Sequence, residues 1–221
     1  MFKNIVFVIK IFSDLPKQMR WSYLPPLMVY LAAGISGLTS IVGTFFIKDY
    51  LNLTASFLVS LTFWASLPWA LKMPLGHLVD LIWKKKNYLV FLGAIVISFS
   101  LLIMYGLIAH TKSMSSIITV ESWFILSVLL VPIGFVIQDV VADAMTVEAV
   151  PKYKSNGEAY SEVKIKEMHT TMQTLGRFAI VGGTVIISLA NVILFQGVDK
   201  LDDNELINLY ANIYLYALSI P

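Results

Sequence analysis

The sequence predicts an all-α integral membrane protein built as a bundle of six helices. Hydrophobic residues make up 57% of the 221-residue chain and charged residues only 14%, whereas a soluble domain carries about a quarter charged residues. The mean hydropathy of +0.77 agrees. Uncharged apolar runs also recur along the chain, and about 20 such residues suffice to cross the hydrocarbon core of a bilayer.

Short polar connections separate the predicted spans, so consecutive spans are expected to run antiparallel. The sixth span looks truncated, and residues 1–20 are expected to form a cytoplasmic N-terminal segment. Two prolines, Pro68 and Pro74, are expected to kink the second span. The predicted bundle covers residues 21–221, with spans at about 21–47, 54–82, 87–109, 122–149, 170–197 and 206–221.

Lysine and arginine predict the orientation of these spans. Three connections on one side hold only Lys48, Lys112 and Lys200. Because basic residues collect on the cytoplasmic side, the opposite side and the N-terminus are predicted to be cytoplasmic. In a bacterium, this multi-pass protein would lie in the inner membrane. The cytoplasmic set is Lys3, Lys10, Lys17, Arg20, Lys84, Lys85, Lys86, Lys152, Lys154, Lys164 and Lys166.

The composition argues against several other functions. A net charge of +2 and the lack of a basic face interleaved with aromatics argue against nucleic-acid binding. The chain contains no cysteine, which excludes disulfides and thiolate metal sites. We see no metal triad, no nucleophile–base pair and no phosphate-binding loop. The sequence therefore predicts no enzyme, no cofactor and no metal site.

Four charged residues fall well inside the predicted spans, where ionisable groups are costly and usually functional. Lys72 belongs to the second span, Asp139 and Asp143 to the fourth, and Arg177 to the fifth. A helical rise of about 1.5 Å per residue places them at a similar depth on the cytoplasmic side of the midplane. Asp139 and Asp143 are four residues apart and therefore share one helix face.

A third acid, Glu148, is expected at the cytoplasmic rim. Pro151 disfavours helix at the preceding Val150, so the helix should end close to Glu148. Two interpretations of the buried charges remain open. An aspartate could pair with Arg177 or Lys72 only to make burial tolerable. The favoured interpretation is that the cluster lines a water-filled cavity that binds a charged solute or a proton.

Small residues predict where helices pack closely. Ala33, Gly34 and Gly37 occur in the first span, and Gly182 and Gly183 in the fifth. Such residues let helix backbones approach each other within a membrane.

The end of the second span, "GHLVDLIWKKK", resembles the major facilitator signature between the second and third helices of that superfamily. Gly76, Asp80, Lys84 and Lys85 match, and Trp83 stands where the signature has a later glycine. The resemblance implies that the aspartate and the basic residues form a cytoplasmic gate. We place Glu148 at the same gate.

Three stretches resemble the folate–biopterin transporter family in particular: "GLTSIVGTFFIKDYLNL", "LPWALK" with the following glycine and aspartate, and "QDVVADAMTVE". Muropeptide permeases and acetyl-CoA transporters share a Q-D-I-x-x-D variant, so Gln138 leaves these relatives open. The matching residues are Gly37, Leu38, Lys48, Asp49, Leu51, Leu53, Leu67, Pro68, Trp69, Lys72, Gly76, Asp80, Asp139, Val140, Asp143, Ala144, Val147, Glu148, Gln173, Arg177, Gly182 and Gly183.

Such transporters have twelve helices in two six-helix halves, with the solute between them. The resemblance implies that this chain is an N-terminal half and that it moves an anionic organic solute, such as a folate or pterin, by alternating access with proton symport. Lys72 and Arg177 would bind the anion, and Asp139 and Asp143 would bind a proton or solute polar groups. The alternatives are a muropeptide or acetyl-CoA-type permease, and a non-transporting remnant or subunit that needs a separate C-terminal half or a second copy.

Overall fold

The computed structural model describes residues 19–46 and 53–221. Within them the chain is helical, apart from loops and one isolated antiparallel bridge between Tyr153 and Ala159. The longer helices are α2 (Leu24–Ile35), α4 (Ala55–Ala70), α5 (Lys72–Leu81), α6 (Lys86–Ala109), α8 (Val120–Ala149), α9 (Glu162–Leu194) and α10 (Asp203–Ala217). The shorter ones are η2 (Trp21–Tyr23), η3 (Ser36–Thr39), α3 (Ser40–Phe46), η5 (Trp83–Lys85), α7 (Thr111–Ser115) and η6 (Val198–Lys200).

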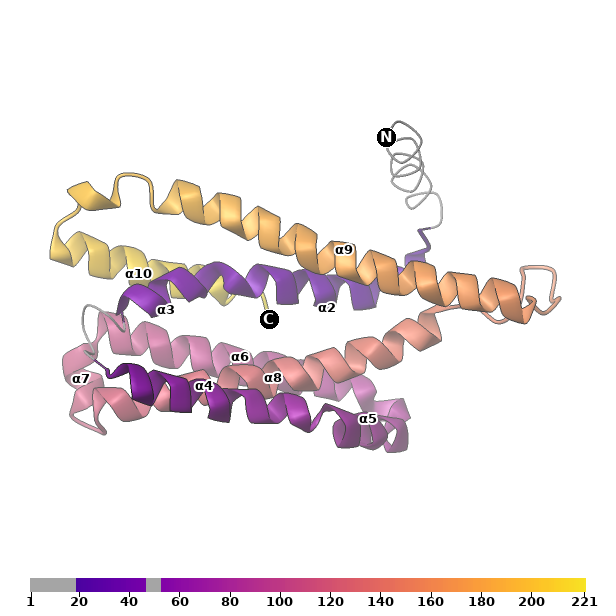
Figure 1. Cartoon of the computed structure of the whole chain (residues 1–221), viewed down its shortest axis with the longest axis horizontal. Helices are drawn as coiled ribbons and strands as arrows, with labels where there is room; N and C mark the ends of the chain where they lie inside the picture. Colours follow the sequence, from indigo (N-terminus) through magenta and orange to yellow (C-terminus); the bar gives the residue numbers. More distant parts are fainter. Residues whose placement is uncertain (1–18, 47–52) are drawn as a thin grey trace.

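The helices pack as two neighbouring groups. Figure 1 shows α9 running along α2, while α6 lies along α8 on the other side of the bundle. Helices α4 and α5 also pack against α8, and α10 packs against α6. Helix α2 contacts both α9 and α8, so it joins the two groups.

The first predicted span changes its winding near its middle. Helix α2 passes into the 3-10 turn η3 before α3 resumes. The Ser36 hydroxyl donates to the Ala33 carbonyl at 2.6 Å, and the Ser40 hydroxyl donates to the Gly37 carbonyl at 2.7 Å. A 3-10 segment within a longer helix marks strain or a hinge. This turn is therefore the most deformable point of the first span.

The second predicted span is broken at Leu71, as its prolines predict. Leu71 has φ −83° and ψ 1°, and it separates α4 from α5. Pro68 lies inside α4, and Pro74 follows the break in the first turn of α5. Proline has no N–H, and its ring clashes with the carbonyl four residues earlier. The break makes Lys72 the first residue of α5.

The fifth and sixth helices begin earlier than the sequence analysis placed them. Helix α9 begins at Glu162 instead of residue 170, after Ser161 whose side chain accepts from the Lys164 amide. Helix α10 begins at Asp203 instead of residue 206, inside a capping box of Asp202 and Glu205. Such caps satisfy the free N–H groups of a first turn. The helices therefore start in polar sequence before their apolar runs.

Four helical stretches are long and apolar enough to cross a membrane: Trp21–Thr44, Lys86–Ala109, Val120–Ala149 and Glu162–Lys200. The break at Leu71 divides the second predicted span into pieces of 16 and 10 residues, and α10 has 15 residues. The protein is thus an all-helical multi-pass membrane protein. The six-helix major facilitator half and its orientation stay predictions.

Glycines bring two pairs of helices into backbone contact. A Cβ at Gly183 of α9 would lie 2.6 Å from the Leu31 carbonyl oxygen of α2, and a Cβ at Gly34 would overlap the Ile180 carbonyl. A Cβ at Gly93 of α6 would lie 2.8 Å from the Gly134 carbonyl oxygen of α8. The sequence analysis predicted close packing by small residues of the first and the fifth span without pairing the two, and it missed the glycines of the α6–α8 contact.

Two of the predicted small residues do not make close contacts. A Cβ at Gly182 would meet nothing within 4 Å, and one at Gly37 would meet only the Ile187 side chain at 3.8 Å. Gly182 is one residue from Gly183, a rotation of about 100° on a helix, which turns it away from α2. The prediction that Gly182 packs closely is therefore wrong.

Some predictions fall outside the described residues. They are the N-terminal segment up to residue 18, and the matched residues Lys48, Asp49 and Leu51. The last basic residue of that segment is described, and the Arg20 guanidinium donates to the Tyr160 hydroxyl at 3.5 Å.

Candidate functional site

Three of the four charges predicted at mid-depth form one cluster around Lys72. Its Nζ lies 2.5 Å from Asp139 Oδ2 and 2.8 Å from Asp143 Oδ2. The two aspartates stand one turn apart on α8, so both can reach the first residue of α5. The helix break and the four-residue spacing of the acids together create this site.

Tyr30 adds a third helix to the cluster. Its hydroxyl donates to Asp143 Oδ1 at 2.6 Å, and the residue is only 9% exposed. Its ring packs on α9, because a Cβ at Gly176 would lie 2.8 Å from Tyr30 Cε2. Tyr30 therefore links the α2–α9 pair to the charged face of α8.

The cluster is only partly enclosed by this chain. The exposed fraction of the side chain is 38% for Lys72, 22% for Asp139 and 50% for Asp143. With all three ionised, one ammonium faces two carboxylates, which leaves one negative charge in excess. Asp143 is the most exposed of the three groups and is the one that a proton or solute can reach most easily.

Arg177 does not join the cluster. It follows Gly176, the residue beneath the Tyr30 ring, so its backbone lies beside the cluster. Its side chain is exposed, however, and within the described part of the chain no ion pair to it is found. The sequence analysis offered Lys72 and Arg177 as partners for the aspartates. In the structure the aspartates pair with Lys72.

Arg177 belongs to a polar stripe that follows α9. At about 100° per residue, the polar residues of this stripe fall within about 60° of one another around the helix. The first four are exposed, and the last is buried. Hydrocarbon would be a poor environment for this face of a spanning helix. The stripe consists of Gln173, Arg177, Thr184, Ser188 and Asn191.

Glu148, which was predicted at the cytoplasmic rim, lies in the last turn of α8 and forms an ion pair. Glu148 Oε2 lies 2.6 Å from Nζ of Lys86. Helix α8 ends at Ala149, and Val150 is extended with ψ 114°, as expected before Pro151. The salt bridge connects α8 to the start of α6.

The other predicted gate residues make no such link to any residue that the structure describes. Asp80, Lys84 and Lys85 are exposed, and the described residues provide no ion pair for them. A Cβ at Gly76 would meet nothing within 4 Å. The turn that contains Trp83 still closes without a glycine, because the Lys85 amide donates to the Ile82 carbonyl at 2.7 Å. These residues therefore face outward from the described part of the chain.

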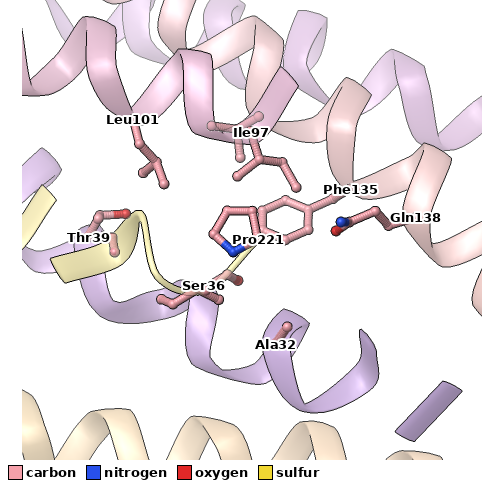
Figure 2. A pocket seen from close by; sticks show the side chains of 11 residues that line it. Ala32, Ser36, Thr39, Ile97, Leu101, Phe135, Gln138 and Pro221 are labelled. Atoms are coloured by element: carbon pink, nitrogen blue, oxygen red, sulfur yellow. The ribbon is translucent and has the colours of Figure 1, made fainter. Parts of the chain in front are cut away.

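Figure 2 shows a small internal cavity where α6, α8, η3 and the C-terminal residues meet, with Phe135 next to Pro221. Its volume of about 40 Å³ can hold water. Pockets for organic ligands have volumes of about 300 to 1,000 Å³. Gln138 lines this cavity, but its Nε2 also donates to the Val90 carbonyl at 3.3 Å, so it helps to join α8 to α6.

Sequence reasoning missed several polar contacts. Tyr30 carries the only polar side chain in α2, and a buried tyrosine hydroxyl needs a partner, which was a usable signal. Lys86 was counted only as part of a basic run. The buried hydroxyls of Ser100 on α6 and Ser127 on α8 lie 2.8 Å apart, and no spacing in the sequence indicates that pair.

Among the described residues, no group of three or more His, Asp or Glu side chains could hold a metal ion.

Comparison with known families gives one match: a family model described as the BT1 family matches residues 33–164. The match includes η3, the broken second span and the whole acidic end of α8, and so it contains Lys72, Asp139 and Asp143. Comparisons with curated proteins and with solved structures gave no match.

Proposed function

The chain belongs to the BT1 family, a family of membrane transporters, and on that premise we propose that its Lys72 cluster and Arg177 form the proton and solute sites of a secondary transporter. The transport would proceed by alternating access, with a proton carried together with a small organic anion. The gate would lie at the predicted cytoplasmic end, around Glu148, Asp80, Lys84 and Lys85.

The observation that carries this proposal is the contact of one lysine with two aspartates at a helix break. A cluster kept only for structural pairing would need one acid for one base. A second carboxylate within 2.8 Å of the same ammonium leaves a negative charge that burial in a membrane disfavours. Asp143, which is half-exposed and accepts from Tyr30, supports a role as the proton acceptor.

Charge balance explains how proton and solute would be coupled. Lys72 and Arg177 carry two positive charges, and Asp139 and Asp143 carry two negative charges, so the four groups sum to zero. An anion alone would leave this part of the membrane negative, and a proton alone would leave it positive. When both bind, the sum stays at zero, which is the cheapest loaded state in a low dielectric.

Arg177 is the better of the two cations for binding an anion. Lys72 is already held by both aspartates, whereas the Arg177 guanidinium is exposed and presents several N–H donors. A guanidinium can bind a carboxylate through two parallel hydrogen bonds. These features suit the carboxylate of a folate or another pterin derivative, the solute class that the sequence resemblance implies.

The exposed face of α9 also favours a protein partner. Gln173, Arg177 and Thr184 would contact lipid if this six-helix unit were alone. A second six-helix half, either a C-terminal half or a second copy, would cover this face and enclose the solute. Asp80, Lys84 and Lys85 would face the same partner at the gate.

The test is uptake by proteoliposomes under an imposed proton gradient. Labelled folate, pterin, nucleotides and a muropeptide form the solute panel, and the protein is reconstituted with and without a separately expressed C-terminal half. D143N should retain solute exchange but lose the response to the gradient, because its side chain can no longer take up a proton. R177M should lose uptake of anionic solutes.

K152A serves as the control, because it removes a predicted cytoplasmic charge outside the site. The proposal fails if D143N responds to the proton gradient like the wild type. Retained anion uptake by a folded R177M protein would separately eliminate the assignment of the anion site. If no member of the panel is transported with or without a second half, the non-transporting alternative gains support.

A further inference from the structure

A second polar site lies further along α9. Its last polar residue on this helix, Asn191, comes fourteen residues after Arg177, which is about 21 Å at about 1.5 Å per residue. Here a groove of about 520 Å³ separates α9 from the junction of η3 and α3. This volume is within the range of ligand pockets. Its polar lining consists of Ser40 on α3 and Thr184, Ser188 and Asn191 on α9.

Asn191 is the unusual residue in this groove. It is 6% exposed, and its Oδ1 atom has no hydrogen-bond partner in the structure. A buried amide oxygen without a hydrogen-bond partner is unfavourable. Asn191 lines the groove, but its Oδ1 atom is closed to water in this conformation, so a ligand in the groove satisfies the amide only after the side chain rotates toward it.

The hydroxyls around Asn191 define the chemistry of a ligand. Ser40 donates to the Gly37 carbonyl at 2.7 Å, Thr184 to the Ile180 carbonyl at 3.0 Å, and Ser188 to the Thr184 carbonyl at 2.7 Å. Each hydroxyl proton is therefore used by a backbone carbonyl of the chain, while each oxygen keeps a free lone pair. The groove offers hydrogen-bond acceptors, and none of the described residues that line it is charged.

We infer that this groove is a second solute station, which binds a neutral N–H donor group through Asn191 and the neighbouring hydroxyls. The inference rests on the proposed transport function and adds a part of the solute that Arg177 does not recognise. Amino-substituted heterocycles and amides have the required donors, and Phe195 supplies an apolar surface for a ring. The predicted topology places this station toward the extracytoplasmic end.

The polar stripe of α9 connects the two sites. Asn191 lies within about 40° of Arg177 around the helix, and Thr184 and Ser188 lie between them. The opposite face is apolar and exposed, with Ile186 at 56%. A solute could therefore move along one side of α9 without crossing hydrocarbon.

The absence of cysteine from the chain allows a direct test. S188C places a thiol in the groove, and I186C places one on the opposite face of α9 at nearly the same depth. The thiolate is the form of cysteine that attacks a maleimide, and its formation needs water. In proteoliposomes, a hydrophilic maleimide should label S188C about tenfold or more faster than I186C, because a water-filled site favours the thiolate.

Two small probes then test the hydrogen-bonding chemistry. The first is 2-aminopyrimidine, and the second is 2-methylpyrimidine, which has nearly the same shape but no N–H donors. At millimolar concentration, 2-aminopyrimidine should slow labelling of S188C about threefold or more, whereas 2-methylpyrimidine should not, because only the former can satisfy the amide. Adding N191L to S188C should remove this protection.

Equal labelling of S188C and I186C would overturn the inference, because lipid or a protein segment would then fill the groove. Rapid labelling with equal protection by both probes, or with none, would also overturn it and leave only a water-filled groove. Adding R177M to S188C separates this inference from the transport proposal. Protection should persist in that variant even if uptake is lost.

Discussion

Helices α8 and α9 are the two longest helices of the described chain, and both carry charge at membrane depth, but they handle it differently. On α8, Asp139 and Asp143 are matched by Lys72 and Tyr30 from two neighbouring helices. On α9, Arg177 is exposed and makes no ion pair with the described residues. One helix completes its polar contacts within the chain, and the other presents them outward.

The difference shows which part of the described chain satisfies its own polar groups. The charged face of α8 can form as soon as the chain folds, because every partner comes from α2, α5 or α8. The outer face of α9 needs water, a solute or another protein. Substitutions on α8 should therefore affect both folding and transport, whereas substitutions on the outer face of α9 should affect transport alone.

The largest expected effect comes from disrupting the packing of α9 on α2. G183V should destabilise the protein by about 3 kcal/mol or prevent folding, because its side chain would overlap backbone that cannot move aside. The Leu31 carbonyl oxygen, the Ile35 nitrogen and the Gly34 carbonyl carbon would lie 2.6, 3.0 and 3.1 Å from the new Cβ. Thermal unfolding in detergent, together with the yield of monodisperse protein, measures the effect.

G182V is the matched control, one residue away on the same helix. A Cβ at Gly182 would meet nothing within 4 Å, and valine at a helical position with open space around it should change stability by less than about 0.5 kcal/mol. Equal destabilisation by the two variants would show that α9 is not packed on α2 through Gly183.

The second prediction compares the two intramembrane cations directly. K72M leaves two carboxylates without their cation, and breaking a buried pair costs about 3–5 kcal/mol. Because the three side chains are 22% to 50% exposed, we expect a smaller loss of about 2 kcal/mol. R177M should change stability by less than about 0.5 kcal/mol, although both variants should lose uptake.

Thermal unfolding and uptake are measured on the same preparations of these two variants. A large loss of stability in R177M would mean that Arg177 has a partner in the folded protein. An unchanged stability in K72M would mean that Asp139 and Asp143 do not need the lysine for folding. Either result would remove the contrast between α8 and α9.

The apolar runs and the prolines made much of this architecture predictable. Each predicted span contains a helix, because about 20 apolar residues leave the backbone no other way to satisfy its hydrogen bonds in a membrane. Pro68 and Pro74 predicted the break that frees Lys72. The four-residue spacing predicted that Asp139 and Asp143 act on one face. These features are local, so a single sequence is enough to find them.

The parts that could not be predicted depend on how the helices are turned toward one another. The depth predicted from the helical rise places Arg177 level with the aspartates. The orientation of α9 about its own axis, however, points the Arg177 side chain outward. The same rotation separates Gly183, which contacts α2, from Gly182, which does not. Tyr30 joined the cluster because Gly176 makes room for its ring. Such contacts couple distant segments, and no spacing within one helix encodes them.

The smallest expected effect concerns an ion pair outside the membrane, in the loop that joins α8 to α9. A hydrogen bond from Lys154, at 2.8 Å, holds the pKa of the Glu158 carboxyl below its ordinary value of 4.5, and Asn156 contributes in the same direction. A lowered folded pKa means that the pair stabilises the loop above the unfolded pKa. That contribution is lost as the pH falls through the folded pKa. Because both side chains are exposed, the stabilisation is expected to be far smaller than that around Lys72.

K154A should therefore raise the pKa of Glu158 toward 4.5 without changing uptake. The carboxyl carbon shift of Glu158, followed by NMR through an acid titration in detergent, measures this pKa. K152A, which removes a neighbouring lysine that does not contact Glu158 in the structure, should leave the pKa lower than in K154A. If both variants shift the pKa of Glu158 equally, the overall positive charge of the loop lowers this pKa, and the contact with Lys154 does not. An effect of K154A on uptake would extend the functional region from the membrane-embedded cluster into this loop.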